Sequence, residues 1–215
     1  MLSQGTERLL DVYCEKNAAV AAVREPLRES VALLCDCFER GGKLLICGNG
    51  GSCADADHIV GEFAKAFKLD RPLMGSLTSA LQRQGADGVL LAKRLQGGWP
   101  AINLGAHSAL LTAIVNDVGG EYIYAQQTAV YGRTGDVLLG ISTSGNSRDV
   151  LYAGLVANAK GMKTIGLTGK SGGEMKNQFG ILLRADAETT EDIQDIHSVI
   201  YHAICACVEY QSWGE

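Results

Sequence analysis

The sequence predicts an α/β fold, a flavodoxin-like three-layer α/β/α sandwich with a five-stranded parallel sheet. Short, continuously apolar segments alternate with helical stretches, as parallel strands do when helices cover both faces of their sheet. The expected strands are 44–47, 100–105, 136–141, 162–169 and 180–185. The 215 residues contain no linker, repeat or low-complexity tract, so we expect a single domain over 1–215.

Helices are expected before and between these strands. Residues 3–24 and 26–40 form an N-terminal helical pair separated by Pro26, which is a helix breaker. In the second helix, apolar residues recur at helical spacing at Leu27, Val31, Leu34 and Phe38. The remaining helices are expected at 52–68, 106–120, 121–131, 147–159 and 190–211.

Composition narrows the classes of function. The net charge is −5 and no long basic run occurs, which argues against a general nucleic-acid surface. No apolar stretch reaches the length of a membrane span, and the N-terminus does not resemble a signal peptide. The seven cysteines are an odd number without a CxxC pair, which favours a reducing, cytoplasmic location.

Two glycine-containing turns follow predicted strands and open predicted helices. They are CGNGGS at 47–52 and STSGNS at 142–147. Helix N-termini offer free N–H groups and a partial positive charge, and hydroxyls add further donors for an anion. The candidate phosphate-binding residues are Gly50, Gly51, Ser52, Ser142, Thr143, Ser144 and Ser147.

The alternative is that these are ordinary strand-to-helix turns in which Ser52 and Ser147 are N-caps. The occurrence of two such turns, one with four hydroxyls, favours a phosphate site. Neither turn matches the Walker pattern or GxGxxG, so no nucleotide cofactor is expected.

Two helices carry polar side chains on the side opposite their apolar stripe. In helix 52–68, the stripe of Ala56, Val60, Phe63 and Phe67 leaves His58 and Glu62 facing outward, one turn apart. In helix 190–211, Gln194 and His202 point away from the stripe of Ile193, Ile196, Ile200, Ile204 and Cys207.

These outward groups have two interpretations that the residues alone leave open. Charged helix faces are commonly just solvated. Outward groups also meet across an oligomer interface, and His58, Glu62, Gln194 and His202 supply the nitrogen and oxygen donors that Zn²⁺ accepts. Gln194 and His202 are about 12 Å apart along one helix, so supply from different subunits is the easier construction.

The segments CGNGGS, GDVLLGISTSGNS, KGMKTIGLTGKSGG and EDIQDIHSVIYHAI, in this order, resemble the sugar isomerase (SIS) domain superfamily. Within it the chain is similar to the phosphoheptose isomerase branch, over about residues 1–68 and 99–211. The two glycine turns and the helix with the IQ-x-x-H pattern are the most specific parts of the resemblance.

The resemblance implies a homotetramer with active sites between subunits, and a sugar phosphate as substrate. It implies that the serine-rich turns contact the phosphosugar and that Asn49 and Asp117 line the site. The residue matching Glu62 is the base that moves the sugar proton, and that matching His202 is its acid/base partner. Some members bind zinc through residues matching His58, Glu62, Gln194 and His202.

The chain also departs from the family pattern. Residues 69–98 are much longer than the corresponding connection, and we expect them to hold one or two short helices that form a lid or reshape the sugar pocket. Cys53 stands where a histidine often follows the serine, and Glu191 replaces an aspartate. These changes leave the phosphate turns intact and bear on which sugar is used.

The sequence therefore predicts an aldose–ketose isomerase acting on a sugar phosphate, most simply sedoheptulose 7-phosphate and a heptose 7-phosphate. The alternative is a non-catalytic phosphosugar-binding protein, either a sensor or a tetrameric regulator that binds a replication initiator. The presence of both Glu62 and His202 favours the enzyme, because a binding protein does not need them.

Overall fold

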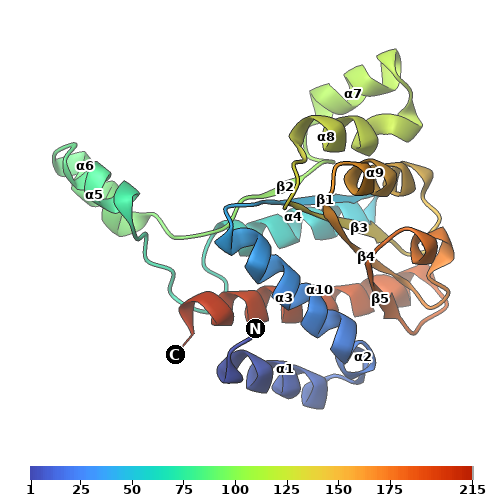
Figure 1. Cartoon of the computed structure of the whole chain (residues 1–215), viewed down its shortest axis with the longest axis horizontal. Helices are drawn as coiled ribbons and strands as arrows, with labels where there is room; N and C mark the ends of the chain where they lie inside the picture. Colours follow the sequence, from blue (N-terminus) through green and yellow to red (C-terminus); the bar gives the residue numbers. More distant parts are fainter. Residues whose placement is uncertain (215) are drawn as a thin grey trace.

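A computed structural model describes residues 1–214 and contains one five-stranded parallel sheet with helices on both faces (Figure 1). The strands lie in the order β2-β1-β3-β4-β5, which is the doubly wound order of flavodoxin-like folds. They are β1 Leu44–Gly48, β2 Ala101–Asn103, β3 Val137–Ser142, β4 Lys163–Gly169 and β5 Ile181–Ala185. The predicted fold class is confirmed.

Two apolar layers hold the sandwich together, because alternate side chains of each strand point to opposite faces. In β1, Leu44 and Ile46 pack with the helices of one layer, whereas Leu45 and Cys47 pack on the other face. The first layer comprises α1 Gln4–Lys16, α2 Ala18–Ala22, α3 Arg24–Glu39, α4 Gly51–Ala64 and α10 Thr190–Trp213. The second comprises α8 Ile123–Tyr131 and α9 Arg148–Ala159, near α7 Ser108–Asp117.

The N-terminal region differs from the expected helical pair. The first expected helix is interrupted at Asn17, whose side chain accepts the N–H of Ala19 and caps α2. It is interrupted again at Val23, which precedes α3. Pro26 does not break a helix but lies in the first turn of α3, where its missing N–H costs no intrahelical hydrogen bond.

Three further helices, α4, α7 and α8, are shorter than predicted. Helix α4 ends at Ala64 instead of residue 68, because the N–H groups of Phe67, Lys68 and Leu69 all donate to the carboxylate of Glu209. The expected helices 106–120 and 121–131 become α7 and α8, joined by the 3₁₀ turn η1 Gly120–Tyr122. A second 3₁₀ turn, η2 Gly173–Asn177, follows β4.

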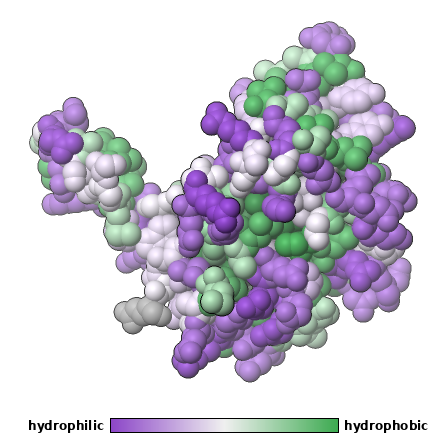
Figure 2. Space-filling model, viewed as in Figure 1, coloured by the Kyte–Doolittle hydropathy of each residue, from purple (hydrophilic) through white to green (hydrophobic). Residues whose placement is uncertain are grey.

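The inserted segment forms an arm, which we define as residues 73–95. Its helices, α5 Ser76–Gln82 and α6 Ala86–Arg94, pack on one another and stand away from the sandwich (Figures 1 and 2). At its foot, Pro72 pairs with Gln96 in an antiparallel bridge and Gly97 N–H donates to Arg71 O at 2.7 Å. The expected short helices are present, but they do not cover this chain's own strand ends as a lid.

Helix α10 is the longest helix and its middle is buried on nearly all sides. Along 200–209 only the side chain of His202 remains partly exposed. Despite this apolar burial, none of the helices in residues 1–214 has both the length and the hydrophobicity needed to cross a bilayer.

Candidate active site

The two glycine turns lie side by side at the carboxyl edge of the sheet, because β1 and β3 are paired neighbours in register. In open α/β sheets this edge is where ligands bind. The first turn enters α4 at Gly50, whose φ of 56° is a conformation that suits glycine. The second turn enters α9 after Ser147.

The hydroxyls of the second turn are directed at one another. Ser142 Oγ and Ser147 Oγ lie 2.8 Å apart, and Ser144 Oγ accepts the N–H of Asn146 at 3.1 Å. Gly169 N–H donates to Thr143 O at 3.0 Å, which fixes the turn to the end of β4. Four hydroxyl-bearing residues thus lie in the turn that leads into α9, a composition that suits an anion site at a helix N-terminus.

The alternative N-cap roles of these serines are not observed. Ser147 occupies the N-cap position of α9 but makes no side-chain capping bond, because its hydroxyl pairs with Ser142. The N-cap of α4 is Gly50, and Ser52 lies inside the first turn of the helix, buried. Neither serine therefore caps its helix, although in the first turn of α9 the carboxylate of Asp149 accepts the N–H of Val150 at 2.9 Å.

The first turn brings Asn49 and Gln194 to the same edge. Asn49 Nδ2 donates to Asp149 Oδ1 at 3.0 Å, so the two turns are linked. A Cβ built on Gly51 would lie 2.3 Å from Gln194 Nε2, so the Gln194 amide covers the start of α4. Only glycine at position 51 permits this approach.

His58, Glu62 and His202 meet where α4 packs on α10. The Nε2 atom of His58 lies 3.2 Å from Glu62 Oε1 and 3.4 Å from His202 Nε2. The other oxygen of Glu62, Oε2, is buried without a hydrogen-bond partner, and Lys65 Nζ is 3.7 Å from it. The three side chains form one cluster of nitrogen and oxygen donors.

This arrangement corrects two expectations. Glu62 does not face outward: only 9% of the residue is exposed, because α4 buries a broader arc than the predicted stripe, including Ile59. Phe67, assigned to that stripe, lies beyond the end of the helix. The cluster also assembles within one chain, so bringing His58, Glu62 and His202 together does not require a second subunit.

Sequence reasoning missed the residues behind His58. Tyr201 Oη lies 3.1 Å from His58 Nδ1, and burial raises the pKa of the Tyr201 hydroxyl and that of the nearby Asp55 carboxyl. Tyr201 therefore stays protonated and holds one ring nitrogen of His58, leaving Nε2 to face Glu62 and His202. The sequence feature that could have indicated Tyr201 is its position directly before His202 in SVIYHAI, on the helix that carries this candidate site residue.

His202 is poised as a neutral imidazole. Burial, followed by the neighbouring His58, lowers its pKa below the ordinary value of 6.5. Its ring stacks on that of Phe67, with centroids 5.8 Å apart and an interplanar angle of 20°. A neutral imidazole can accept a proton at one nitrogen and donate from the other, as proton shuttling requires.

Asp117 is not brought to this cluster by its own chain. It lies exposed at the end of α7, where Asn116 Nδ2 donates to its Oδ1 at 2.7 Å. Gln194 is likewise at the start of α4, separated from His202 by about two turns of α10. Of the four expected zinc ligands, the structure therefore groups three.

The donor chemistry at the cluster fits zinc, although the placement is not that of a preformed site. Among residues 1–214, no group of three or more His, Cys, Asp and Glu side chains is arranged to hold a metal ion. Two imidazole nitrogens and an orphaned carboxylate oxygen are nevertheless ligands that Zn²⁺ uses. These donors would have to rearrange before they could surround an ion.

Comparison with known proteins agrees with the geometry. The SIS domain family matches residues 14–98 and 91–169. The chain is 38% identical to the phosphoheptose isomerase of Helicobacter pylori strain P12 over 191 residues, which is 89% of this chain and 86% of that protein. It is 36% identical to that of Burkholderia pseudomallei strain K96243 over 97% of this chain and 91% of that one.

A solved structure extends this similarity to the fold. The phosphoheptose isomerase GmhA of Neisseria gonorrhoeae superposes with a TM-score of 0.72 at 32% identity, covering 94% of this chain and 97% of that one. The shared fold and the high mutual coverage lead to one assignment. The chain belongs to the SIS domain family and, within it, to the phosphoheptose isomerases.

Proposed function

We propose that the protein is a sugar-phosphate isomerase that interconverts sedoheptulose 7-phosphate and a heptose 7-phosphate. The observation that carries the proposal is the position of Glu62, a buried carboxylate with an unpartnered oxygen, beside two histidines and on the helix that starts at a phosphate-type turn. Relatives of this chain over almost their whole length are named phosphoheptose isomerase.

The serine-rich turn is proposed to hold the phosphate. Ser142, Thr143, Ser144 and Ser147, with Ser52 and the backbone at Gly50 and Gly51, supply hydroxyl and amide donors. Asn49, Asp117 and Gln194 are proposed to contact the sugar, with Asp117 needing a partner subunit or a movement of α7 to do so. Phosphate binding far from the reacting carbons supplies binding energy for orientation.

Proton transfer is proposed to proceed through an enediol. Glu62 removes a proton from C1 of the ketose, and the C–H electron pair forms the C1=C2 double bond while His202 protonates the C2 oxygen. His202 then removes the proton from the C1 oxygen, C1 becomes the aldehyde carbon, and Glu62 returns its proton to C2. Atoms and electrons balance, because the aldose and ketose are isomers.

His58, Glu62 and His202, with Gln194 after a rearrangement, are the residues proposed to hold Zn²⁺. When bound, the ion would supply positive charge that stabilises the oxygens of the enediol. In the chain itself, His58 is held by Tyr201 and keeps Nε2 directed at Glu62. Metal analysis of the purified protein, before and after chelation, tests the zinc proposal.

We further propose a homotetramer in the reducing cytoplasm, with sites completed between subunits. Support comes from the apolar side chains that the arm exposes, including Met74, Leu77 and Leu90, and from free thiols at all seven cysteines. Light scattering after size-exclusion chromatography tests the assembly. A monomer with full turnover would contradict the shared site.

The decisive experiment is turnover of sedoheptulose 7-phosphate by the wild type and by Glu62→Gln. Loss of the base is expected to reduce kcat by about 10²–10⁴-fold while the phosphate end still binds. Glu7→Gln, at a partly buried ion pair with Arg28, is the matched control. Full activity of Glu62→Gln would remove the assigned base. Thermal stabilisation of the wild type by sugar phosphates without any turnover would support a sensor instead.

A further inference from the structure

Arg71 is a fully buried arginine at the point where the chain leaves the sandwich for the arm. Its Nε donates to Glu209 Oε1 at 2.7 Å, and the exposed fraction is 1% for each residue. Its Nη2 donates to the backbone oxygen of Glu62 at 2.9 Å, and its Nη1 to that of Phe63 at 3.1 Å. A buried charge is tolerated only with such complete pairing.

The two backbone oxygens belong to the last turn of α4, which carries Glu62. The final carbonyls of a helix have no intrahelical donors and need external ones. Here the Arg71 guanidinium supplies two, and Trp99 N–H supplies a third to Phe63 O at 3.0 Å. A cation at a helix C-terminus also complements the helix dipole. The two ends of the inserted segment therefore cap the turn on which Glu62 sits.

The same guanidinium reaches α10 through Glu209. Glu209 lies seven residues after His202, which is about two turns and the same face of the helix. Its carboxylate also accepts the N–H groups that follow α4, from Phe67 to Leu69. One ion pair thus ties the turn of Glu62 to the helix of His202.

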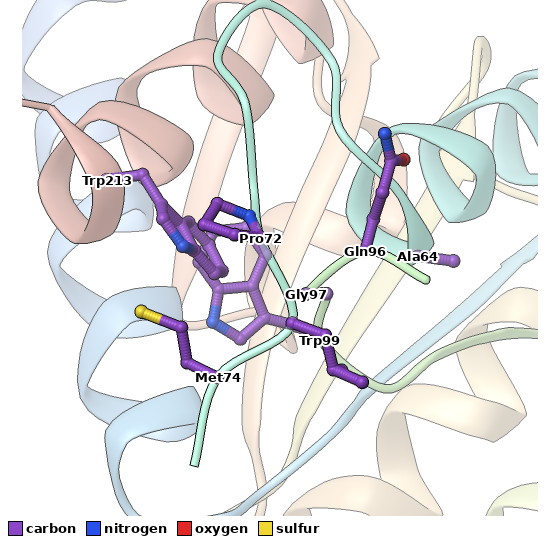
Figure 3. Close-up of a pocket in the computed structure, with 9 residues that line it drawn as sticks. Ala64, Pro72, Met74, Gln96, Gly97, Trp99 and Trp213 are labelled. Atoms are coloured by element: carbon purple, nitrogen blue, oxygen red, sulfur yellow. The ribbon is translucent and has the colours of Figure 1, made fainter. Parts of the chain in front are cut away.

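Two indole rings cover the guanidinium. Arg71 Cζ lies 4.8 Å from the ring centroid of Trp99 and 5.2 Å from that of Trp213. The two rings contact each other at a centroid distance of 4.6 Å, beside a cavity of about 480 Å³ at the foot of the arm (Figure 3). Trp99 and Trp213 are the only tryptophans of the chain, so tryptophan fluorescence reports on the surroundings of these two rings.

We propose that Arg71 is a positioning residue for proton transfer: with Glu209, Trp99 and Trp213 it forms a clamp that fixes the carboxylate of Glu62 relative to His202. This inference rests on the proposed isomerase function, because it assigns Glu62 and His202 the reacting protons. Arg71 itself lies behind the backbone of α4 and acts through Glu62. Loss of the clamp should therefore lower kcat. KM should remain nearly unchanged, because most of the substrate's binding energy is proposed to come from the phosphate turn.

The test compares Arg71→Met and Arg71→Lys with the wild type. Glu209 retains three backbone N–H donors when the guanidinium is removed, so Arg71→Met is expected to fold. A misplacement of about 1 Å costs on the order of 10²-fold in rate, which is the kcat loss expected for Arg71→Met. A lysine at position 71 can still pair with Glu209, but it lacks the planar guanidinium that reaches both carbonyls. Arg71→Lys should therefore have a kcat about tenfold higher than that of Arg71→Met.

Lys43→Met is the matched control. Lys43 Nζ forms a partly buried ion pair with Asp136 at 2.6 Å at the opposite edge of the sheet, and Asp136 likewise keeps backbone donors, from Lys43 and Arg133. It should lower the melting temperature without changing kcat. Tryptophan emission should shift to longer wavelength in Arg71→Met and remain at the wild-type position in Lys43→Met.

The outcomes separate the two proposals. A wild type that turns over no sugar phosphate defeats the proposed function. An active wild type with unchanged kcat in folded Arg71→Met, or with an equal kcat loss in Lys43→Met, overturns the clamp. A loss confined to KM overturns it as well. If neither Arg71 variant folds, kcat of Trp213→Ala is the test. This substitution, at the end of α10, removes the indole from one face of the Arg71 guanidinium. An unchanged kcat would then overturn the proposal.

Discussion

The Nε2 atoms of His58 and His202 face each other at 3.4 Å, across the contact between α4 and α10. Two imidazole nitrogens at this distance share one proton or one ligand, and they cannot both be charged without repulsion. Burial, followed by the neighbouring His58, lowers the pKa of His202 below its ordinary value, which favours the neutral form of the His202 ring. A neutral ring can donate a proton from one nitrogen and accept one at the other, which suits the proposed shuttle role of His202.

Replacement of His202 by Asn should reduce kcat by about 10²-fold or more, because a proton shuttle contributes on that scale. Phosphate binding should persist, so KM for a sugar phosphate should change little. His107→Asn, at an exposed histidine before α7, is the control. Steady-state kinetics on sedoheptulose 7-phosphate measure both constants, and unchanged kcat in His202→Asn would exclude the assigned role.

Ser147→Ala should weaken phosphate binding. A hydrogen bond to a charged group is worth about 1.5–3 kcal/mol, so KM should rise about 10- to 100-fold while kcat is kept. Ser30→Ala is the matched control, because its buried hydroxyl donates to Pro26 O at 2.7 Å, within α3. Equal KM values for the two variants would argue against an anion at the 142–147 turn.

Two glycines of α4 provide a contrast within one helix. In Gly51→Ala, the new Cβ would displace the Gln194 amide, whereas Gly61→Ala meets nothing within 4 Å. Gly61→Ala should raise the free energy of unfolding by roughly 0.5–1 kcal/mol with little change in activity. Gly51→Ala should lower kcat/KM by about tenfold or more, since small misplacements are costly. Equal kinetics in both variants would mean that Gln194 does not touch the substrate.

His197 should make stability depend on pH. It is fully buried, and burial lowers its pKa from 6.5 to about 4. Between these values the unfolded chain binds more protons than the folded one, so stability falls as pH decreases from 6.5 towards 4, by roughly 3 kcal/mol in total. Urea unfolding at about pH 7 and about pH 4.5 should show a smaller pH effect in His197→Leu than in the wild type. Identical pH effects would contradict the assignment.

Removal of the arm should shrink the assembly and lower kcat, because the apolar side chains that the arm exposes are proposed to hold together the subunits that complete each site. Replacing 73–95 by Asn-Gly joins Pro72 to Gln96 through a two-residue hairpin, the connection that their antiparallel bridge requires. Arg71 and Trp99 then keep their contacts with α4. A deletion variant with wild-type assembly and wild-type kcat would contradict a role of the arm in oligomer contacts. A loss of kcat with assembly unchanged would place the arm in the active site.

The fold and the turns were predictable because they depend on local patterns. Continuous apolar strands and glycine turns identify the sheet and its carboxyl edge without knowledge of tertiary contacts. Helix ends were less predictable: α4 stops at Ala64 because Glu209, far away in the sequence, captures the following N–H groups. No window of residues around 64 contains that information.

The site was predictable in its members but not in its environment. A helical wheel assumes one buried stripe, yet α4 is enclosed by both the sheet and α10, so Glu62 is buried although the wheel placed it outside. Arg71 and Glu209 were missed for a related reason. Each is an ordinary charged residue in the sequence. Only their ion pair in the folded chain offsets the cost of removing both charges from water.

The contact between Ser142 and Ser147 has a consequence for which molecules the protein accepts. At 2.8 Å the two hydroxyls satisfy each other, so a neutral sugar hydroxyl entering the turn would exchange one hydrogen bond for another of similar strength. A dianionic oxygen forms charge-assisted bonds roughly twice as strong and so displaces that pairing with a net gain. If the turn holds the phosphate as proposed, it would discriminate by the charge of the terminal group, and unphosphorylated heptuloses should bind more weakly than their phosphates.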